Sequence, residues 1–202
     1  MRPLFTFLPF TAVAAQSARH VKARQASPIL ITNVTHQGRG CPEGWMAHDN
    51  DPDRRSTVIT YEAFQVSIGD NLGPPASMSC DVTIGLRFPS GCTMATYDIT
   101  FRGFGLVDSG VTGSATAQFS ISSGTVSPST GDPISFSPSI LRGDNVNWIK
   151  AYNVASTTRL QGARELNLTV RNGMSLSTSN RNSKGNIQAE FLLFHVKSQS
   201  GC

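Results

Sequence analysis

The chain has 202 residues, of which only 15% are charged, and its 17 Lys and Arg exceed its 13 Asp and Glu by four. Four cations, Arg2, Arg19, Lys22 and Arg24, precede Gln25, so the remainder carries 13 charges of each sign. A neutral body with scattered charges excludes the electrostatic footprint of a nucleic-acid-binding protein. Few ions together with many Ser, Thr, Gly and Asn residues are typical of an extracellular, β-rich domain.

Residues 1–15 have the features of a secretory signal peptide. Arg2 supplies a positive charge, Leu4–Ala15 is apolar apart from two threonines, and Val13-Ala14-Ala15 offers the small residues that a signal peptidase accepts. About 12 apolar residues are too few to cross a bilayer, which takes about 20. We therefore expect a secreted, extracellular protein without a membrane span. A basic flexible leader, residues 16–28, is expected to precede a single domain, residues 29–202.

Short runs with an apolar residue at every second position follow one another along the chain. Such alternation is typical of β-strands with one buried and one solvated face. The pair Asn172-Gly173 between two such segments predicts a two-residue hairpin. The pattern predicts an all-β fold, a two-sheet, jelly-roll-like β-sandwich. The runs are Phe64–Ile68, Val82–Phe88, Ala95–Phe101, Ala115–Ile121 and Leu166–Val170, with turn-forming clusters at 69–71, 89–91, 108–110, 127–133 and 172–173.

The last run, Glu190–Lys197, is apolar on both faces. Leu192, Phe194 and Val196 share one face, and Phe191 and Leu193 make much of the other face apolar too. This composition favours a central strand that is covered on both sides.

Four cysteines, Cys41, Cys80, Cys92 and Cys202, would be oxidised on the secretory route, so two disulfides are expected to staple the sandwich. No C-x-x-C spacing supports a metal site. If the strands on either side of 89–91 form a hairpin, Cys80 lies roughly 27 Å from the level of Cys92, whereas a disulfide needs Cα atoms within about 7 Å. By the alternation of their runs, Cys80 is expected on a buried face and Cys92 on a solvated face. The predicted bonds are Cys41–Cys80 and Cys92–Cys202.

Two acceptor sequences for N-glycosylation are present, Asn33-Val34-Thr35 and Asn167-Leu168-Thr169. Asn167 falls on the solvated face of its run, where a glycan would not disturb packing. We expect a glycoprotein with acceptors Asn33 and Asn167.

Catalytic signatures do not occur in the sequence, and no catalytic residue is assigned. There is no G-x-S-x-G motif, and His195 is interpreted as a half-buried strand residue rather than a base. The alternative function is a carbohydrate-active hydrolase that uses paired carboxylates. Asp81 and Asp98 lie on the solvated faces of runs expected to be neighbours, and acid–base hydrolysis needs two carboxylates about 5–10 Å apart.

The segment His48–Asp53 holds the densest group of oxygen ligands. Calcium is bound by such loops in extracellular β-sandwiches, but the spacing here matches no calcium loop, and Asp-Pro and Asn-Asp pairs form turns. A solvated turn is favoured, and no metal or cofactor is expected.

Trp148 and Tyr152 are the candidate carbohydrate-binding residues. They lie among asparagines in a region expected to be loop-like, and exposed rings serve as stacking platforms for sugars. The alternative interpretation, which we favour, makes Trp148 and Trp45 plugs that seal the core.

One set of segments spans most of Ile31–Cys202: Gly40-Cys41-Pro42, Phe64–Gly69, Ser79–Ile84 with Pro89 and Gly91, Arg102–Phe104, Leu106–Gly113, Glu165–Val170 and Cys202. In these segments the chain resembles a family of small secreted proteins of unknown function, common in filamentous fungi and also found in bacteria. In this family a cysteine usually follows the tryptophan that Trp148 resembles, whereas this chain has Cys92 elsewhere, which implies a rearranged second disulfide. The resemblance implies secretion and a β fold, and it implies no activity.

The sequence therefore favours a non-catalytic extracellular protein. Its expected partners are a cell-wall polysaccharide or a host-surface component, with no nucleic acid, and we expect a monomer.

Overall fold

The computed structural model describes residues 27–69, 76–136, 146–158, 164–180 and 182–200. All its strand pairs are antiparallel, and no helix occurs in these ranges. The expected signal peptide and nearly all of the expected leader lie outside the described residues. The strands are β1 (Leu30–Gln37), β2 (Met46–Asn50), β3 (Ser56–Tyr61), β4 (Gln65–Ile68), β5 (Ser77–Phe88), β6 (Met94–Val107), β7 (Val111–Ile121), β8 (Gly124–Ser127), β9 (Ile134–Phe136), β10 (Val146–Thr158), β11 (Arg164–Thr178) and β12 (Gly185–Ser200).

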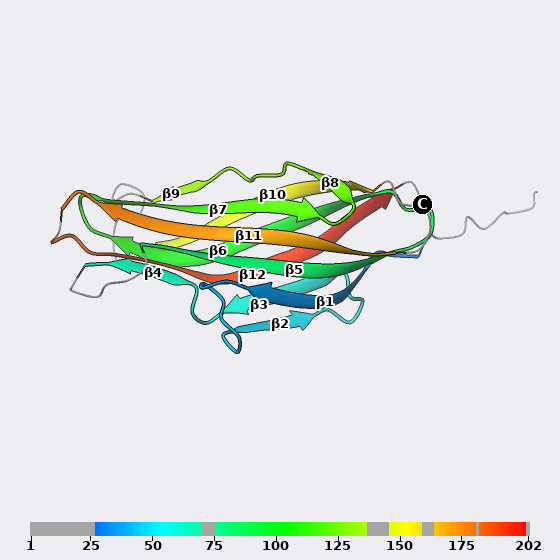
Figure 1. Ribbon diagram of the computed structural model, residues 1–202, viewed down its shortest axis with the longest axis horizontal. Coiled ribbons are helices and arrows are strands. Elements are labelled where there is room, and N and C mark those ends of the chain that lie inside the picture. Colours follow the sequence, from blue (N-terminus) through cyan, green and yellow to red (C-terminus); the bar gives the residue numbers. More distant parts are fainter. Residues whose placement is uncertain (1–26, 70–75, 137–145, 159–163, 181, 201–202) are drawn as a thin grey trace, which may run out of the picture.

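The strands form two sheets that are stacked face to face (Figure 1). The five-stranded sheet has the order β1-β5-β11-β7-β9. The seven-stranded sheet has the order β2-β3-β12-β6-β10-β8, and β4 pairs with β12 beside this path. The predicted all-β fold with two sheets is therefore confirmed.

The core lies between the sheets and is built from the predicted buried faces. Every second residue of β5, β6, β7 and β11 points inward, and the apolar members of these runs are buried. Aromatic rings fill the centre: Tyr97 stacks on Phe194 at a centroid distance of 5.3 Å, and Phe119 meets Tyr152 edge to face at 5.4 Å. Burial of alternate apolar faces is the main stabilising contribution to such a sandwich.

The predicted hairpin around 89–91 is wrong. β5 belongs to the five-stranded sheet and β6 to the seven-stranded sheet, so the segment Pro89–Thr93 crosses from one layer to the other. Alternation shows which face of a strand is buried, but it does not identify the neighbouring strand. The prediction for Cys92 is wrong as well. Its side chain was expected on a solvated face, but it is buried, with 2% of its surface exposed.

The predicted hairpin at Asn172-Gly173 is also wrong. Both residues lie within the continuous 15-residue strand β11. The Asn172 side chain points into the core, where its Nδ2 donates a hydrogen bond of 3.0 Å to Tyr61 Oη. This buried polar contact holds the chain extended where the local sequence favours a turn.

β12 is central in its sheet, as predicted, with β3 on one side and β6 on the other. Leu192, Phe194 and Val196 are buried, but Leu193 is 36% exposed. The expectation that this strand is covered on both sides is therefore wrong, because its second face is the outer surface of the sandwich.

Candidate binding groove

The outward face of the five-stranded sheet is almost entirely polar. The even-numbered residues of β11 from Leu166 to Leu176 are buried, so the odd-numbered residues between them point outward, between β5 and β7. Strand pairing aligns these residues in rows that follow each other at about 6.8 Å along β11. In the order β5–β11–β7 the rows are Ser77–Ser175–Ser114, Ser79–Gly173–Thr116, Asp81–Arg171–Gln118 and Thr83–Thr169–Ser120.

Hydroxyl groups within these rows are hydrogen-bonded across the strands. Ser114 Oγ lies 3.0 Å from Ser175 Oγ, and Thr83 Oγ1 lies 3.2 Å from Thr169 Oγ1. A hydroxyl can donate one hydrogen bond and accept two, so each retains capacity toward solvent or a ligand.

Two hollows lie over successive rows of this face, and together we call them the polar groove. The first has a volume of about 410 Å³ and the second about 430 Å³. Both are bordered by β7 and β11. Polar residues of the first include Arg39, Ser77, Ser79, Ser114, Thr116 and Ser175, and those of the second include Gln118, Ser120, Ser129, Thr130, Thr169 and Arg171.

Gly173 leaves the first hollow open. It points outward from β11 and has no side chain, and a Cβ built there would lie 2.9 Å from Thr116 Oγ1. Any larger residue at this position would project into the hollow.

A loop fixed to β5 places Arg39 at the rim of the first hollow. Cys41 forms a disulfide with Cys80, with Cα atoms 5.5 Å apart, and the Gly40 amide donates a hydrogen bond of 2.9 Å to the carbonyl of Ser79. The predicted Cys41–Cys80 bond is therefore confirmed, and it attaches the loop beside the groove.

An ion pair occupies the third of the four rows of the groove. Arg171 donates from Nε and Nη2 to the two carboxylate oxygens of Asp81, at 2.8 and 2.7 Å. These hydrogen bonds hold the pKa of Asp81 below its usual range. The Asp81 carboxylate is therefore ionised, and both of its oxygens already accept hydrogen bonds from Arg171. It is a poor general acid for this reason.

The candidate carbohydrate-binding residues Trp148 and Tyr152 lie elsewhere, in the core. Each is 8% exposed, because even-numbered residues of β10 point inward. Trp148 packs against Phe136 and over Gly103, where a side chain would collide with the indole ring. The stacking-platform hypothesis for these two residues is therefore wrong, and the interpretation of Trp148 as a core plug is confirmed.

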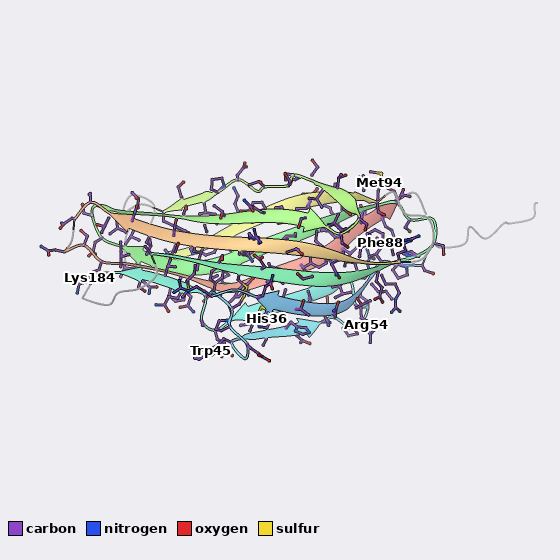
Figure 2. The ribbon with its side chains drawn as sticks, in the orientation of Figure 1. His36, Trp45, Arg54, Phe88, Met94 and Lys184 are labelled. Carbon is purple, nitrogen blue, oxygen red and sulfur yellow. A yellow bond between two sulfur atoms is a disulfide. The ribbon has the colours of Figure 1, made fainter. Side chains whose placement is uncertain are left out.

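Trp45 is not a plug. It is 52% exposed and lies on the segment between β1 and β2, at the lower edge of the molecule in Figure 2. Trp45 immediately precedes β2, which is the terminal strand in the order of its sheet.

The two carboxylates of the hydrolase hypothesis lie on opposite surfaces. Asp81 is on the outward face of the five-stranded sheet, whereas Asp98 is on the outward face of the seven-stranded sheet. The core separates them, so they cannot act on one glycosidic bond. The expectation that their strands are neighbours failed together with the hairpin around 89–91.

His195 is half-buried in β12, as predicted. Its Nδ1 lies 2.8 Å from Ser56 Oγ of β3, a contact between residues 139 positions apart that the sequence did not indicate. Asp98 is in the same row of strand pairs, but its Oδ1 accepts hydrogen bonds from Asn153 and Lys197, at 2.8 and 3.4 Å. The Asn153 contact is the main cause of the lowered pKa of Asp98.

The segment His48–Asp53 forms the end of β2 and a turn into β3. The Asp51 carbonyl accepts a hydrogen bond from the Arg54 amide, and the Asp53 carboxylate accepts one from the Arg55 amide, at 2.8 and 3.0 Å. The interpretation as a turn is confirmed for residues 51–53 and is wrong for His48–Asn50, which belong to β2. Within the described ranges, no group of three His, Cys, Asp or Glu residues could hold a metal ion.

Three further expectations concern the ends and surface of the chain. Asn33 and Asn167 are both exposed. Cys202 lies outside the described residues, and the Cys92–Cys202 bond stays a prediction. In the part of the chain that the structure describes, no helix is long and apolar enough to cross a membrane.

A model of the family described as "Domain of unknown function (DUF4360)" matches residues 27–200. A protein of Arthroderma benhamiae, named an uncharacterized secreted protein, is 27% identical over 162 residues, which cover 78% of this chain and 63% of that protein. The chain thus spans less than two thirds of that relative's length. Together with the disulfide, this similarity confirms the expected extracellular location.

Two solved structures are similar at low scores. They are TmCBM61 in complex with beta-1,4-galactotriose and the CBM36-1 domain of a multidomain xylanase from the hindgut metagenome of Trinervitermes trinervoides. Each is 12% identical and covers 82% of this chain, and the matches cover 90% and 99% of those chains with TM-scores of 0.25 and 0.28. Scores this low carry no inference about fold or ligand.

Proposed function

The chain belongs to the family of domains of unknown function DUF4360, and we propose that it is a non-catalytic extracellular protein whose polar groove binds a polysaccharide. The observation that carries the proposal is the alignment of two hollows over four rows of hydroxyl, amide and guanidinium groups. At about 6.8 Å per row, these rows extend roughly 20 Å along β11. An elongated chain of sugars, each with several hydroxyl groups, suits such a lining.

The groove would bind its ligand through hydrogen bonds. Ser, Thr and Gln side chains both donate and accept, which matches the hydroxyl groups of sugars. The side chains that line the two hollows in the described part of the chain offer no exposed aromatic ring for stacking. With a net contribution of about 1 kcal/mol per hydrogen bond, four such bonds correspond to a Kd on the order of 1 mM. Weak, reversible attachment to a wall or a host surface fits this affinity.

The remaining sequence-based expectations belong to this proposal. It keeps the signal peptide at 1–15, the basic leader at 16–28 and one domain at 29–202, which folds as a jelly-roll-like sandwich and acts as a monomer. Gly40-Cys41-Pro42 would be the family's motif. Cys92–Cys202 would be a second disulfide, which the nearby chain end supports: the Thr93 amide donates to the carbonyl of Ser200 at 3.3 Å. Non-reducing peptide mapping tests this bond, and a Cys41–Cys202 peptide would contradict it.

The function is tested by pull-down of the secreted protein with insoluble chitin, glucan and cellulose. Gly173→Val places a side chain in the first hollow. We expect this variant to be retained at least tenfold less than the unaltered protein on the polysaccharide that the unaltered protein binds. Ala151→Val is the matched control, because Ala151 is exposed on β10 in the other sheet. Retention that is equal for Gly173→Val, Ala151→Val and the unaltered protein would contradict binding in the groove, and retention on none of the polymers would contradict the proposed function.

A further inference from the structure

The two acceptor sequences for N-glycosylation lie side by side on the polar face. Asn33 of β1 pairs with Gly85 of β5, and Gly85 pairs on its other side with Asn167 of β11. The threonines of the two sequences are aligned in the same way, with Thr35 opposite Thr83 and Thr83 opposite Thr169. Two triplets that are 134 residues apart in the chain are therefore in matching register across a single strand.

Gly85 makes this arrangement compact. A Cβ at this position would collide with the side-chain oxygen of Asn33 and lie 2.6 Å from Thr32 Oγ1. The Asn33 side chain thus lies across the space that a larger residue at 85 would fill. Gly85 is buried beneath it, while Asn33 itself is exposed.

The backbones of Asn33 and Asn167 are two strand spacings apart, which is roughly 10 Å. Both side chains are exposed on the outward face of the same sheet. Glycans at both positions would project side by side from the row of Gly85 and Asn167. This row is the next one after Thr83–Thr169–Ser120, at one end of the polar groove.

We propose that Asn33 and Asn167 both carry N-linked glycans, and that the glycan on Asn167 closes the adjacent end of the polar groove. The second part rests on the proposed function, and the first part does not. Attachment uses a lipid-linked oligosaccharide: Asn Nδ2 forms a bond to the anomeric carbon, the bond from that carbon to the lipid diphosphate breaks, and the amide proton passes to a base. With the Asn167 end of the groove closed, the polysaccharide enters from the opposite end, which is formed by Ser77 and Arg39.

Occupancy is tested on protein secreted by a eukaryotic host, by glycopeptide mapping before and after enzymatic removal of N-glycans. We expect both peptides to be modified. Thr35→Ala should abolish modification of Asn33, whereas the matched variant Thr35→Ser, which keeps the acceptor sequence, should retain it. Asn167→Gln should remove the second glycan. A map in which either peptide of the unaltered protein is unmodified overturns the paired glycans.

The effect on the groove is tested with the polysaccharide that the pull-down retains. Asn167→Gln secreted by the eukaryotic host should bind severalfold more tightly than the glycosylated protein, and Thr35→Ala should change binding less. Both variants should bind like the unaltered protein when all are made in a host that does not glycosylate. Equal binding by Asn167→Gln and the glycosylated protein overturns closure of the groove. Absence of any retained polymer overturns the proposed function and leaves the mapping to decide the paired glycans.

Discussion

Arg171 of β11 holds Asp81 of β5 through two hydrogen bonds, at 2.8 and 2.7 Å, in the third of the four rows of the polar groove. The Asp81 side chain is 13% exposed, whereas that of Arg171 is 61% exposed. The pair therefore presents a guanidinium edge to solvent above a shielded carboxylate. Arg171 also lines the second hollow, and the pair links the neighbouring strands β11 and β5.

The pair should make stability depend on pH in the acid range. The pKa of Asp81 is lowered in the folded protein, mainly by the hydrogen bonds from Arg171. Its contribution is present above the ordinary aspartate pKa and is lost as pH falls through the lowered pKa of the folded state. Asp81→Asn should lower the urea midpoint at about pH 7, and the difference from the unaltered protein should shrink as pH falls below the ordinary aspartate pKa of about 4. Asp49→Asn on β2 is the control, and a difference that persists unchanged to the lowest pH would contradict the assignment.

Removal of the Cys41–Cys80 bond should destabilise the fold and release the loop that carries Arg39. The bond joins residues 39 positions apart, for which the chain-entropy model gives about 4 kcal/mol. We expect Cys41→Ser with Cys80→Ser to lose about this free energy of unfolding in urea titrations. Binding at a temperature where the variant remains folded should also weaken, because Arg39 would no longer be fixed at the groove. An unchanged free energy of unfolding would contradict this account.

Trp148 should matter for stability and not for ligand binding. Trp148→Ala removes a buried ring that packs on Phe136 and Gly103, and it should cost about 3–5 kcal/mol in urea unfolding. Trp148→Phe keeps much of the apolar contact and removes an indole N–H that has no hydrogen-bond partner in the described part of the protein, so its cost should be clearly smaller. Loss of polysaccharide binding in folded Trp148→Phe would contradict the role as a plug.

The three tyrosines should resist ionisation until the protein unfolds. Burial is the main cause that raises the pKa of Tyr61, and it raises the pKa of Tyr97 and of Tyr152 to about 12. Their contribution to stability is complete below the ordinary tyrosine pKa of about 10 and is lost as pH rises through the raised values. Phenolate absorbance should therefore stay low near pH 10 in the native protein. The protein in denaturant is the reference, and a native titration with a midpoint near 10 would show that a tyrosine is solvated.

Much of the fold could be predicted from local patterns. Alternation in Val82–Phe88 and Leu166–Val170 correctly indicated which side chains are buried, because each strand must bury its own apolar face. The same parity placed Cys80 in the core and Asn167 on the surface. The Cys41–Cys80 bond is confirmed, but the argument that led to it used the hairpin around 89–91 and a solvated Cys92, and both of these predictions are wrong.

The candidate site was harder to predict. Most of its polar residues are Ser and Thr at the solvent-facing positions of alternating runs. Such residues are ordinary on a β-sheet surface and give no sign of a groove. The groove exists because β11 lies between β5 and β7, so that Gly173 falls among Ser79, Thr116 and their neighbours. The sequence-based candidate was Trp148 instead, and the sequence did not show that this side chain points inward from β10.

The sequence by itself determined the strands that carry alternating runs, the buried faces of those runs and the oxidising environment in which the chain folds. It did not reveal β10, whose region around Trp148 and Tyr152 was expected to be loop-like. Only the tertiary structure decided which strands are neighbours, and with that the separation of Asp81 from Asp98 and the alignment of Asn33 with Asn167. The physical reason is that burial of an apolar face is a requirement of each strand alone, and many partner strands can meet it. The choice among partners depends on contacts between distant residues, such as Arg171 of β11 with Asp81 of β5 across 90 positions, which no local pattern encodes.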